Sequence, residues 1–130
     1  MRTLQWSQSH AVFISEIDDE HREIFEALSA GDFSRLPHAI AGHFAHEERL
    51  MQAARYSSMA WHKQQHDAAR KRVKQFLQKI QAGDPKAAEA LVEYLTNWLH
   101  NHTRLADTML GAFLRNHRRA YRMTFSLGLR

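Results

Sequence analysis

Apolar residues recur along this chain every three or four positions, the spacing of an amphipathic α-helix, over four separate stretches. Short segments with glycine, proline, serine or aspartate divide the stretches, and these residues begin and end helices. The expected helices start at Asp18 or Asp19, Ser34, Ser58 and Asp84-Pro85, and the first three end at Gly31-Asp32, about Tyr56 and Gly83. No alternating run of β-branched residues predicts a strand.

The connections between these helices are short, which favours antiparallel neighbours. We therefore predict an all-α fold, an antiparallel up-down-up-down four-helix bundle with an N-terminal arm and a basic C-terminal extension. The length of 130 residues is typical of one domain. We expect the bundle to span about residues 18–112 and the basic segment to span 113–130.

Polar residues interrupt the apolar face of every predicted helix. The inward polar residues are His21 on the first helix, His43 and Glu47 on the second, His62 and His66 on the third, and His102 and Asp107 on the fourth. Burying such groups without partners costs several kcal/mol each, and five satisfied histidines are hard to fit into one small core. A bound metal removes that cost, so the pattern predicts a metal centre.

The spacing within each helix supports this interpretation. His43 and Glu47, like His62 and His66, are four residues apart and share a helical face, with about 6 Å between their Cβ atoms. His102 and Asp107 are five residues apart, which a regular helix would separate by about 140° around its axis. Either the fourth helix bulges there or Asp107 reaches in from the side.

The chain has no cysteine, so disulfides, thiolate zinc sites and iron–sulfur clusters are excluded, and any metal must be bound by nitrogen and oxygen. Seven ligands are too many for one tetrahedral zinc ion. They suit two six-coordinate irons that share both carboxylates as bridges. A structural bundle with zinc at part of the site is an alternative that leaves the remaining ligands unexplained.

Four motifs in this chain, taken together, resemble those of bacterial hemerythrins. They are Ile-Asp-x-x-His at 17–21, His-Phe-x-x-Glu-Glu-x-x-Met at 43–51, His-x-x-x-His at 62–66, and Trp-Leu-x-x-His-x-x-x-x-Asp at 98–107. They occur in the family's order and span most of the chain. Trp6 also resembles the tryptophan of the family's N-terminal arm.

The resemblance implies a role for each motif residue. One iron would be bound by His62, His66 and His102 and the other by His21 and His43, with Glu47, Asp107 and an oxo or hydroxo group as bridges. The second iron would then be one ligand short and would bind dioxygen reversibly, for storage, delivery or sensing. The same matching implies that Ile24, Phe44, Trp98 and Leu105 line the ligand pocket.

A di-iron enzyme acting on peroxide, dioxygen or nitric oxide is the alternative function. Di-iron enzymes in ferritin-like bundles use Glu-x-x-His pairs, and no histidine in this chain has a glutamate three residues before it. Histidine-rich ligation instead favours a stable dioxygen adduct. We therefore expect an oxygen-binding protein and not an enzyme, with at most weak peroxidase or oxidase activity.

Charge adds little to this hypothesis. The net charge of +4 arises from residues 115–130, which contain five arginines and no acidic residue. A solvated helix extension is the favoured interpretation of that segment, and a protein partner or membrane surface is the alternative. The body of the chain has no repeated basic face, so we expect no nucleic-acid binding. We expect a cytoplasmic protein, with His10, His38, His46, His100 and His117 in solvent. For His46 and His100, which lie close in sequence to candidate ligands, a contact with the site from outside is the alternative.

Overall fold

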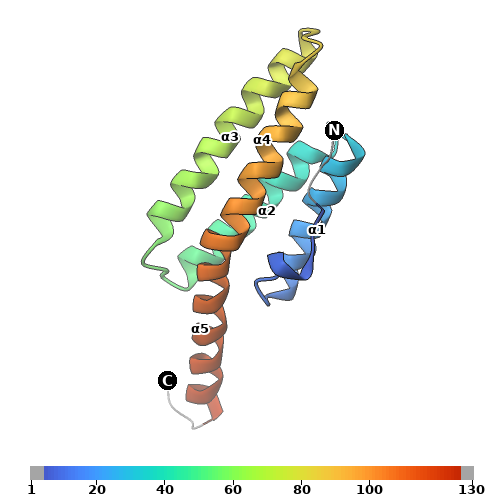
Figure 1. The fold of residues 1–130 in the computed structure, drawn as a ribbon. Coiled ribbons are helices and arrows are strands. Elements are labelled where there is room, and N and C mark those ends of the chain that lie inside the picture. The colour runs from blue at the N-terminus through green and yellow to red at the C-terminus, as the bar shows by residue number, and fades with distance from the viewer. Residues whose placement is uncertain (1–4, 127–130) are drawn as a thin grey trace.

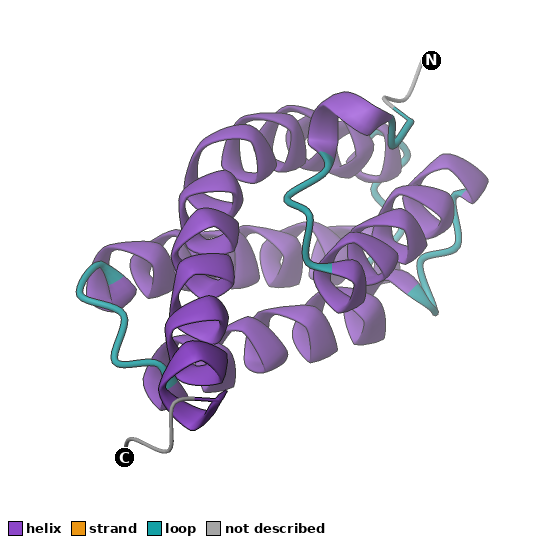
Figure 2. Cartoon of the chain, turned by 90° about the horizontal axis from the view of Figure 1, so that it is seen from below, coloured by secondary structure: helices purple, strands orange, loops and turns teal. Residues whose placement is uncertain are grey.

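The computed structural model describes residues 5–126, and side chains only as far as residue 120. It consists of helices joined by short loops, as Figure 2 shows, and no residue in the described range belongs to a strand. The helices are α1 (Ser15–Ala30), α2 (Leu36–Ala53), α3 (Met59–Gln81), α4 (Ala87–His102) and α5 (Thr108–Ser126), with a 3-10 turn at Gln8–His10 and a π-helical segment at Thr103–Asp107. The all-α prediction is confirmed.

Helices α1 to α4 form the bundle. Each packs against the next along the chain, and α4 also contacts α1, which closes the arrangement. The short loops reverse the chain direction between consecutive helices, so neighbours are antiparallel. Figure 1 shows α5 continuing the line of α4 past the end of the other helices. The predicted four-helix bundle is therefore confirmed.

The predicted start of the first helix is wrong. Helix α1 begins at Ser15, and Asp18 lies inside its first turn. The Asp18 carboxylate instead accepts hydrogen bonds from the backbone N–H groups of Val12, at 2.9 Å, and Phe13, at 3.1 Å. Asp18 thus fixes the N-terminal arm to the bundle, and this contact stabilises Phe13 in the left-handed region with φ 61°.

The other predicted helix ends agree with the structure within three residues. Gly31 ends α1 with φ 65°, and its N–H donates to the carbonyl groups of Ala27 and Leu28. A residue with a Cβ atom adopts this left-handed conformation only at a cost, which explains why glycine stops the helix here.

Two hydrophobic clusters fill the bundle, and the polar residues lie between them. On α1, Ile17 belongs to one cluster and Ile24 to the other, with His21 between. On α2, Phe44 and Met51 flank Glu47 in the same way. The polar layer therefore has packed apolar side chains on both sides, which shield it from water.

The basic segment does not form a separate element in the structure, because α5 runs through the expected boundary at residue 113. Two of its arginines bind the N-terminal region of the same chain. Arg115 donates to the Val12 carbonyl oxygen, and Arg118 pairs with Glu16 at 2.6 Å. Gly111 permits this approach, since a Cβ atom there would lie 2.6 Å from the Val12 oxygen. The side chains of residues 121–130 lie outside the described part of the chain.

Among the described residues, no helix has the length and apolar character needed to cross a membrane.

Candidate metal centre

The seven polar residues predicted from the sequence are all buried, each with at most 5% of its surface exposed. The structure brings them together in two overlapping groups, within which one ligand atom of each residue lies within 4.8 Å of the others. The first group is Glu47, His62, His66, His102 and Asp107, and the second is His21, His43, Glu47 and Asp107. Glu47 and Asp107 belong to both groups, so the two groups share two carboxylates.

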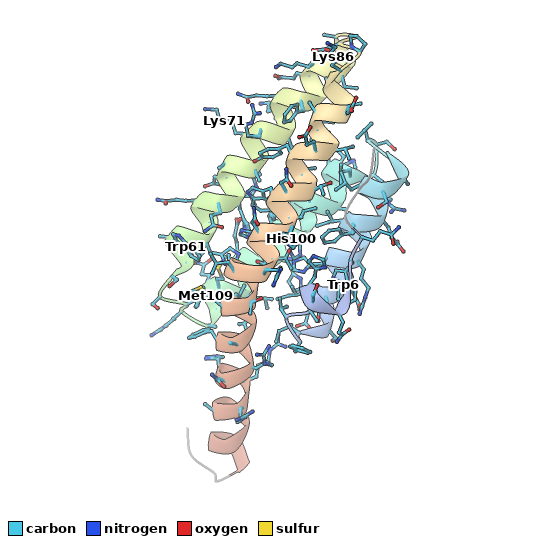
Figure 3. All side chains as sticks on the ribbon, in the orientation of Figure 1. Trp6, Trp61, Lys71, Lys86, His100 and Met109 are labelled. Atoms are coloured by element: carbon cyan, nitrogen blue, oxygen red, sulfur yellow. The ribbon has the colours of Figure 1, made fainter. Side chains whose placement is uncertain are left out.

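Each helix of the bundle supplies part of this cluster. Helix α1 carries one histidine, α2 and α3 each carry a pair of residues four positions apart, and α4 ends at His102. The labelled residues His100 and Met109 in Figure 3 bracket the segment where α4 passes into α5. The bundle core thus brings together groups that are up to 86 positions apart in the sequence.

The five-residue spacing of His102 and Asp107 is explained by the π-helical segment Thr103–Asp107. In a π-helix the hydrogen bonds join residues five positions apart, so a residue five positions on returns to nearly the same face. The extra residue in this turn directs Asp107 toward His102, with 3.1 Å between Asp107 Oδ1 and His102 Nε2. The helix therefore bulges, the first of the two alternatives drawn from the sequence.

The two shared carboxylates each extend one oxygen toward each group of histidines. Glu47 Oε1 lies 3.1 Å from His66 Nε2, and Glu47 Oε2 lies 3.6 Å from His43 Nε2. Asp107 Oδ1 lies 3.0 Å from His62 Nε2, and Asp107 Oδ2 lies 3.0 Å from His21 Nε2. A carboxylate in this position can bind two cations at once, one through each oxygen.

Several of these atoms have no hydrogen-bond partner although they are buried. They are His21 Nε2, both Glu47 oxygens, His66 Nε2 and Asp107 Oδ1. Unpaired buried polar atoms are costly, and these face a common space between the helices. A donor set of imidazole nitrogens and carboxylate oxygens without thiolate suits iron, so the residues present fit a pair of iron ions.

Without a metal, the cluster shifts its own proton equilibria. Burial lowers the pKa of His62, but the close contacts with Asp107 and Glu47 and their negative charges outweigh burial and raise it to about 9. Burial and the Asp107 charge raise the pKa of Glu47. The opposite effect of His43, His62 and His66 is larger, and the resulting pKa is about 2. Burial also opposes the charged form of Asp107, yet its histidine partners keep the pKa of that carboxyl well below its usual range.

A second ring of polar side chains holds three of the histidines by their other ring nitrogen. His43 Nδ1 donates to Glu20 Oε1 at 2.8 Å, His66 Nδ1 donates to Glu48 Oε2 at 2.8 Å, and His102 Nδ1 donates to Gln65 Oε1 at 2.7 Å. Such contacts set the tautomer and orientation of a metal-binding imidazole.

The sequence did not identify Glu20 and Gln65 as functional residues. Each lies next in sequence to one cluster histidine but contacts a different one on another helix, Glu20 on α1 reaching α2 and Gln65 on α3 reaching α4. Their position in the sequence beside His21 and His66 was the only indication of a role. It does not reveal which histidine each residue binds, because these contacts form only between packed helices.

Replacing Glu48 with alanine is expected to weaken iron binding by about 10- to 100-fold, because His66 loses the acceptor that orients it. Competition with a chelator of known iron affinity measures the change. Asp67→Ala is a matched control, since Asp67 also pairs with Arg70 but contacts no histidine of the cluster. Equal losses in the two variants would show that the Arg70 pairing, and not the His66 contact, is responsible.

Three of the four residues predicted to line a pocket lie beside the cluster or in the adjoining core. Ile24 and Phe44 are buried, and the Phe44 ring stacks on His66 with 4.0 Å between centroids. The half-buried Trp98 stacks on His102 at 4.3 Å. Leu105 does not line the cluster. Its side chain lies on the outer face of the π-helical segment and is 58% exposed.

His10 was expected in solvent, and this prediction is wrong. The side chain is 2% exposed, its Nδ1 accepts a hydrogen bond from the Ser7 N–H at 3.0 Å, and its ring packs against Phe25. His46 also has a partner, since its Nδ1 donates to Glu20 at 2.8 Å. The helical patterns gave no indication of the His10 contacts because His10 lies in the N-terminal arm. For His46 the structure agrees with the alternative of a contact beside the site, since Glu20 also binds His43.

Comparison with known proteins supports the same interpretation of the cluster. Residues 12–114 match the model of the hemerythrin HHE cation-binding domain family. The chain is 31% identical to myohemerythrin-1 of Phascolopsis gouldii over 110 residues, covering 78% of this chain and 87% of the relative. It is 34% identical to bacteriohemerythrin of Stenotrophomonas maltophilia over 121 residues, covering 82% and 78%. The matched region contains all seven cluster residues.

Proposed function

Since this chain belongs to the hemerythrin family, we propose that it binds dioxygen reversibly at a carboxylate-bridged pair of iron ions. The observation that carries the proposal is the position of Glu47 and Asp107. Glu47 directs one oxygen toward His62 and His66 and the other toward His43. Asp107 directs one oxygen toward His62 and His102 and the other toward His21.

The proposed ligands divide unequally between the two irons. His62, His66 and His102 would bind one iron, His21 and His43 the other, and an oxo or hydroxo group would join the two carboxylates as a third bridge. The groups have five and four protein donors respectively. An iron at the four-donor group would have one protein ligand fewer than the other, and dioxygen would bind on that side.

The two ferrous ions, when bound, supply the two electrons and the open coordination position that dioxygen requires. The protein supplies the buried, apolar surroundings of the irons. Ile24 and Phe44 are buried in the packed layer next to the cluster, which limits access of water and protons. The outer contacts from Glu20, Glu48 and Gln65 keep the histidine rings in fixed orientations, so the open position has a constant shape.

We propose binding and not catalysis as the principal activity, with weak peroxidase or oxidase activity as a side reaction. The cluster holds five histidines and two carboxylates, and both carboxylates would serve as bridges. This leaves no further carboxylate in the cluster to stabilise a more oxidised iron. We also propose that the chain is one domain, with the basic segment as an extension of the bundle.

Purification under anaerobic conditions with ferrous iron tests the proposal. We expect two irons per chain and a visible absorption band that develops on exposure to air and fades on evacuation. Irreversible bleaching with two irons present would favour the enzymatic alternative. Fewer than two irons per chain would contradict the proposed ligand set.

A further inference from the structure

The side chain of Thr103 is fully buried, and its hydroxyl group has no hydrogen-bond partner. Thr103 follows His102 directly and begins the π-helical segment that ends at Asp107. Most of the unpaired buried atoms in the cluster are imidazole nitrogens or carboxylate oxygens, which a bound metal ion would coordinate. A threonine hydroxyl is a poor iron ligand beside so many imidazoles, so the metal pair does not account for Thr103.

The packing of the helix determines which side of the cluster Thr103 faces. His102 faces α3, because its Nδ1 bonds Gln65 and its Nε2 lies 3.2 Å from His62 Nε2. The other neighbours of this helix are α1 and the turn Gln8–His10. Thr103 lies about 100° further round the helix and is buried, so we assign its side chain to that second side. His21 is located there.

Asp107 gives a second reference point. Thr103 and Asp107 are the first and last residues of the π-helical segment, so they lie within one turn of each other on neighbouring faces of the helix. Asp107 Oδ2 lies 3.0 Å from His21 Nε2, which places the face of Asp107 toward the four-donor group. Together the two reference points assign Thr103 to the side of the helix that faces the four-donor group.

A threonine in a helix normally satisfies its hydroxyl with a carbonyl group of the preceding turn. Thr108, in the same helix, does so by donating to the Thr103 carbonyl oxygen at 3.0 Å. Thr103 has no such bond, although valine would fill the same volume without a buried hydroxyl. An unpaired hydroxyl that destabilises the protein is expected where a ligand supplies the missing acceptor.

We propose that the Thr103 hydroxyl donates a hydrogen bond to a small anionic ligand at the open position of the His21–His43 iron. The inference rests on the proposed function and adds a specificity-determining residue to it. A hydroxyl donor in a water-poor pocket favours ligands that carry or acquire negative charge over neutral ones. Thr103 would therefore strengthen the binding of azide, and of dioxygen as it takes up electrons.

Azide titration of the diferric protein tests the proposal through an affinity. Thr103→Val is expected to weaken azide binding about tenfold, the effect of losing one hydrogen bond to a charged group. Thr103→Ser should retain most of the affinity because it keeps the hydroxyl. Thr96→Val is the matched control, since the Thr96 hydroxyl is also buried and unpaired but lies two turns earlier on α4. Its azide affinity should match the wild type.

The iron-free protein provides a readout that needs no metal. Removing an unpaired buried hydroxyl should leave the Tm of Thr103→Val unchanged or raise it by about 2–5 °C. Thr108→Val, which removes a hydroxyl that is bonded, should instead lower the Tm. A clear fall in the Tm of iron-free Thr103→Val would show that the hydroxyl is structural and would overturn the proposal.

The result for the wild type separates the two proposals. If wild-type protein holds two irons and binds dioxygen reversibly while Thr103→Val binds azide as tightly as wild type, only the role of Thr103 is overturned. If the wild type holds fewer than two irons, the proposed function fails and the role of Thr103 fails with it.

Discussion

Replacing Asp107 with alanine is expected to reduce the iron content from two per chain to less than one and to abolish the dioxygen-dependent absorption band. Asp107 contacts histidines of both groups, with Nε2 atoms of His21, His62 and His102 at 3.0–3.1 Å from its oxygens. The substitution removes one donor from each iron site and one of the two negative charges that balance the cations. Metal analysis of the purified variant measures the loss.

Glu93→Ala is the control for this experiment, because Glu93 is an exposed carboxylate on the adjoining helix α4. Its iron content should equal that of the wild type. Two irons in Asp107→Ala would mean that the carboxylate does not bridge, and the proposed ligand set would then be wrong. Helix content measured by circular dichroism separates loss of metal from loss of fold.

Removal of both irons by a chelator is expected to lower the Tm by about 15 °C or more. Metal that binds only the folded state stabilises it by about 4 kcal/mol per site when its free concentration is a thousand times Kd, and two sites act here. The iron-free protein also retains unpaired atoms such as His66 Nε2 and Asp107 Oδ1 in its core. Calorimetry of the protein with and without iron measures the difference.

The pH dependence of that difference follows from the pKa shifts of the iron-free protein. The pKa of His62 is raised from 6.5 to about 9, so its contribution to stability is complete below pH 6.5 and is lost as the pH rises to 9. The pKa of Glu47 is lowered from 4.5 to about 2, so its contribution is present above pH 4.5 and is lost as the pH falls toward 2. The iron-free protein should therefore be most stable between about pH 4.5 and 6.5.

Stabilisation by iron should increase at high pH, where the stability of the iron-free protein decreases. Iron binds neutral imidazole and so displaces protons from His62 and its neighbours. The increase in Tm caused by iron should grow between pH 6.5 and 9, in buffers that do not bind iron. A constant increase over this range would show that the His62 proton is not displaced when the metal binds.

The sequence predicted much of the site because each of its parts is local. Pairs such as His43 with Glu47 share a face at any four-residue spacing in a helix, and the recurrence of such faces on four helices identified the seven residues now found in one cluster. The five-residue gap before Asp107 required a bulge or a sideways reach, and the structure contains the bulge.

Other features could not be predicted from helical periodicity. The preference of aspartate for helix starts predicts a first helix from Asp18 or Asp19, but tertiary packing places the Val12 and Phe13 N–H groups within reach of the Asp18 carboxylate. Leu105 was placed in the pocket by its match to a motif, yet the direction of its side chain depends on the π-helical turn.

The sequence by itself thus determined the helices, their polar faces and the identity of the candidate metal-binding residues, since each depends on spacing within one helix. Only the tertiary structure decided which oxygen of Glu47 or Asp107 faces which histidines, which side chains hold the imidazoles from outside, and that the Thr103 hydroxyl is buried without a partner. Those properties arise between helices, where distances depend on the packing of side chains far apart in the sequence.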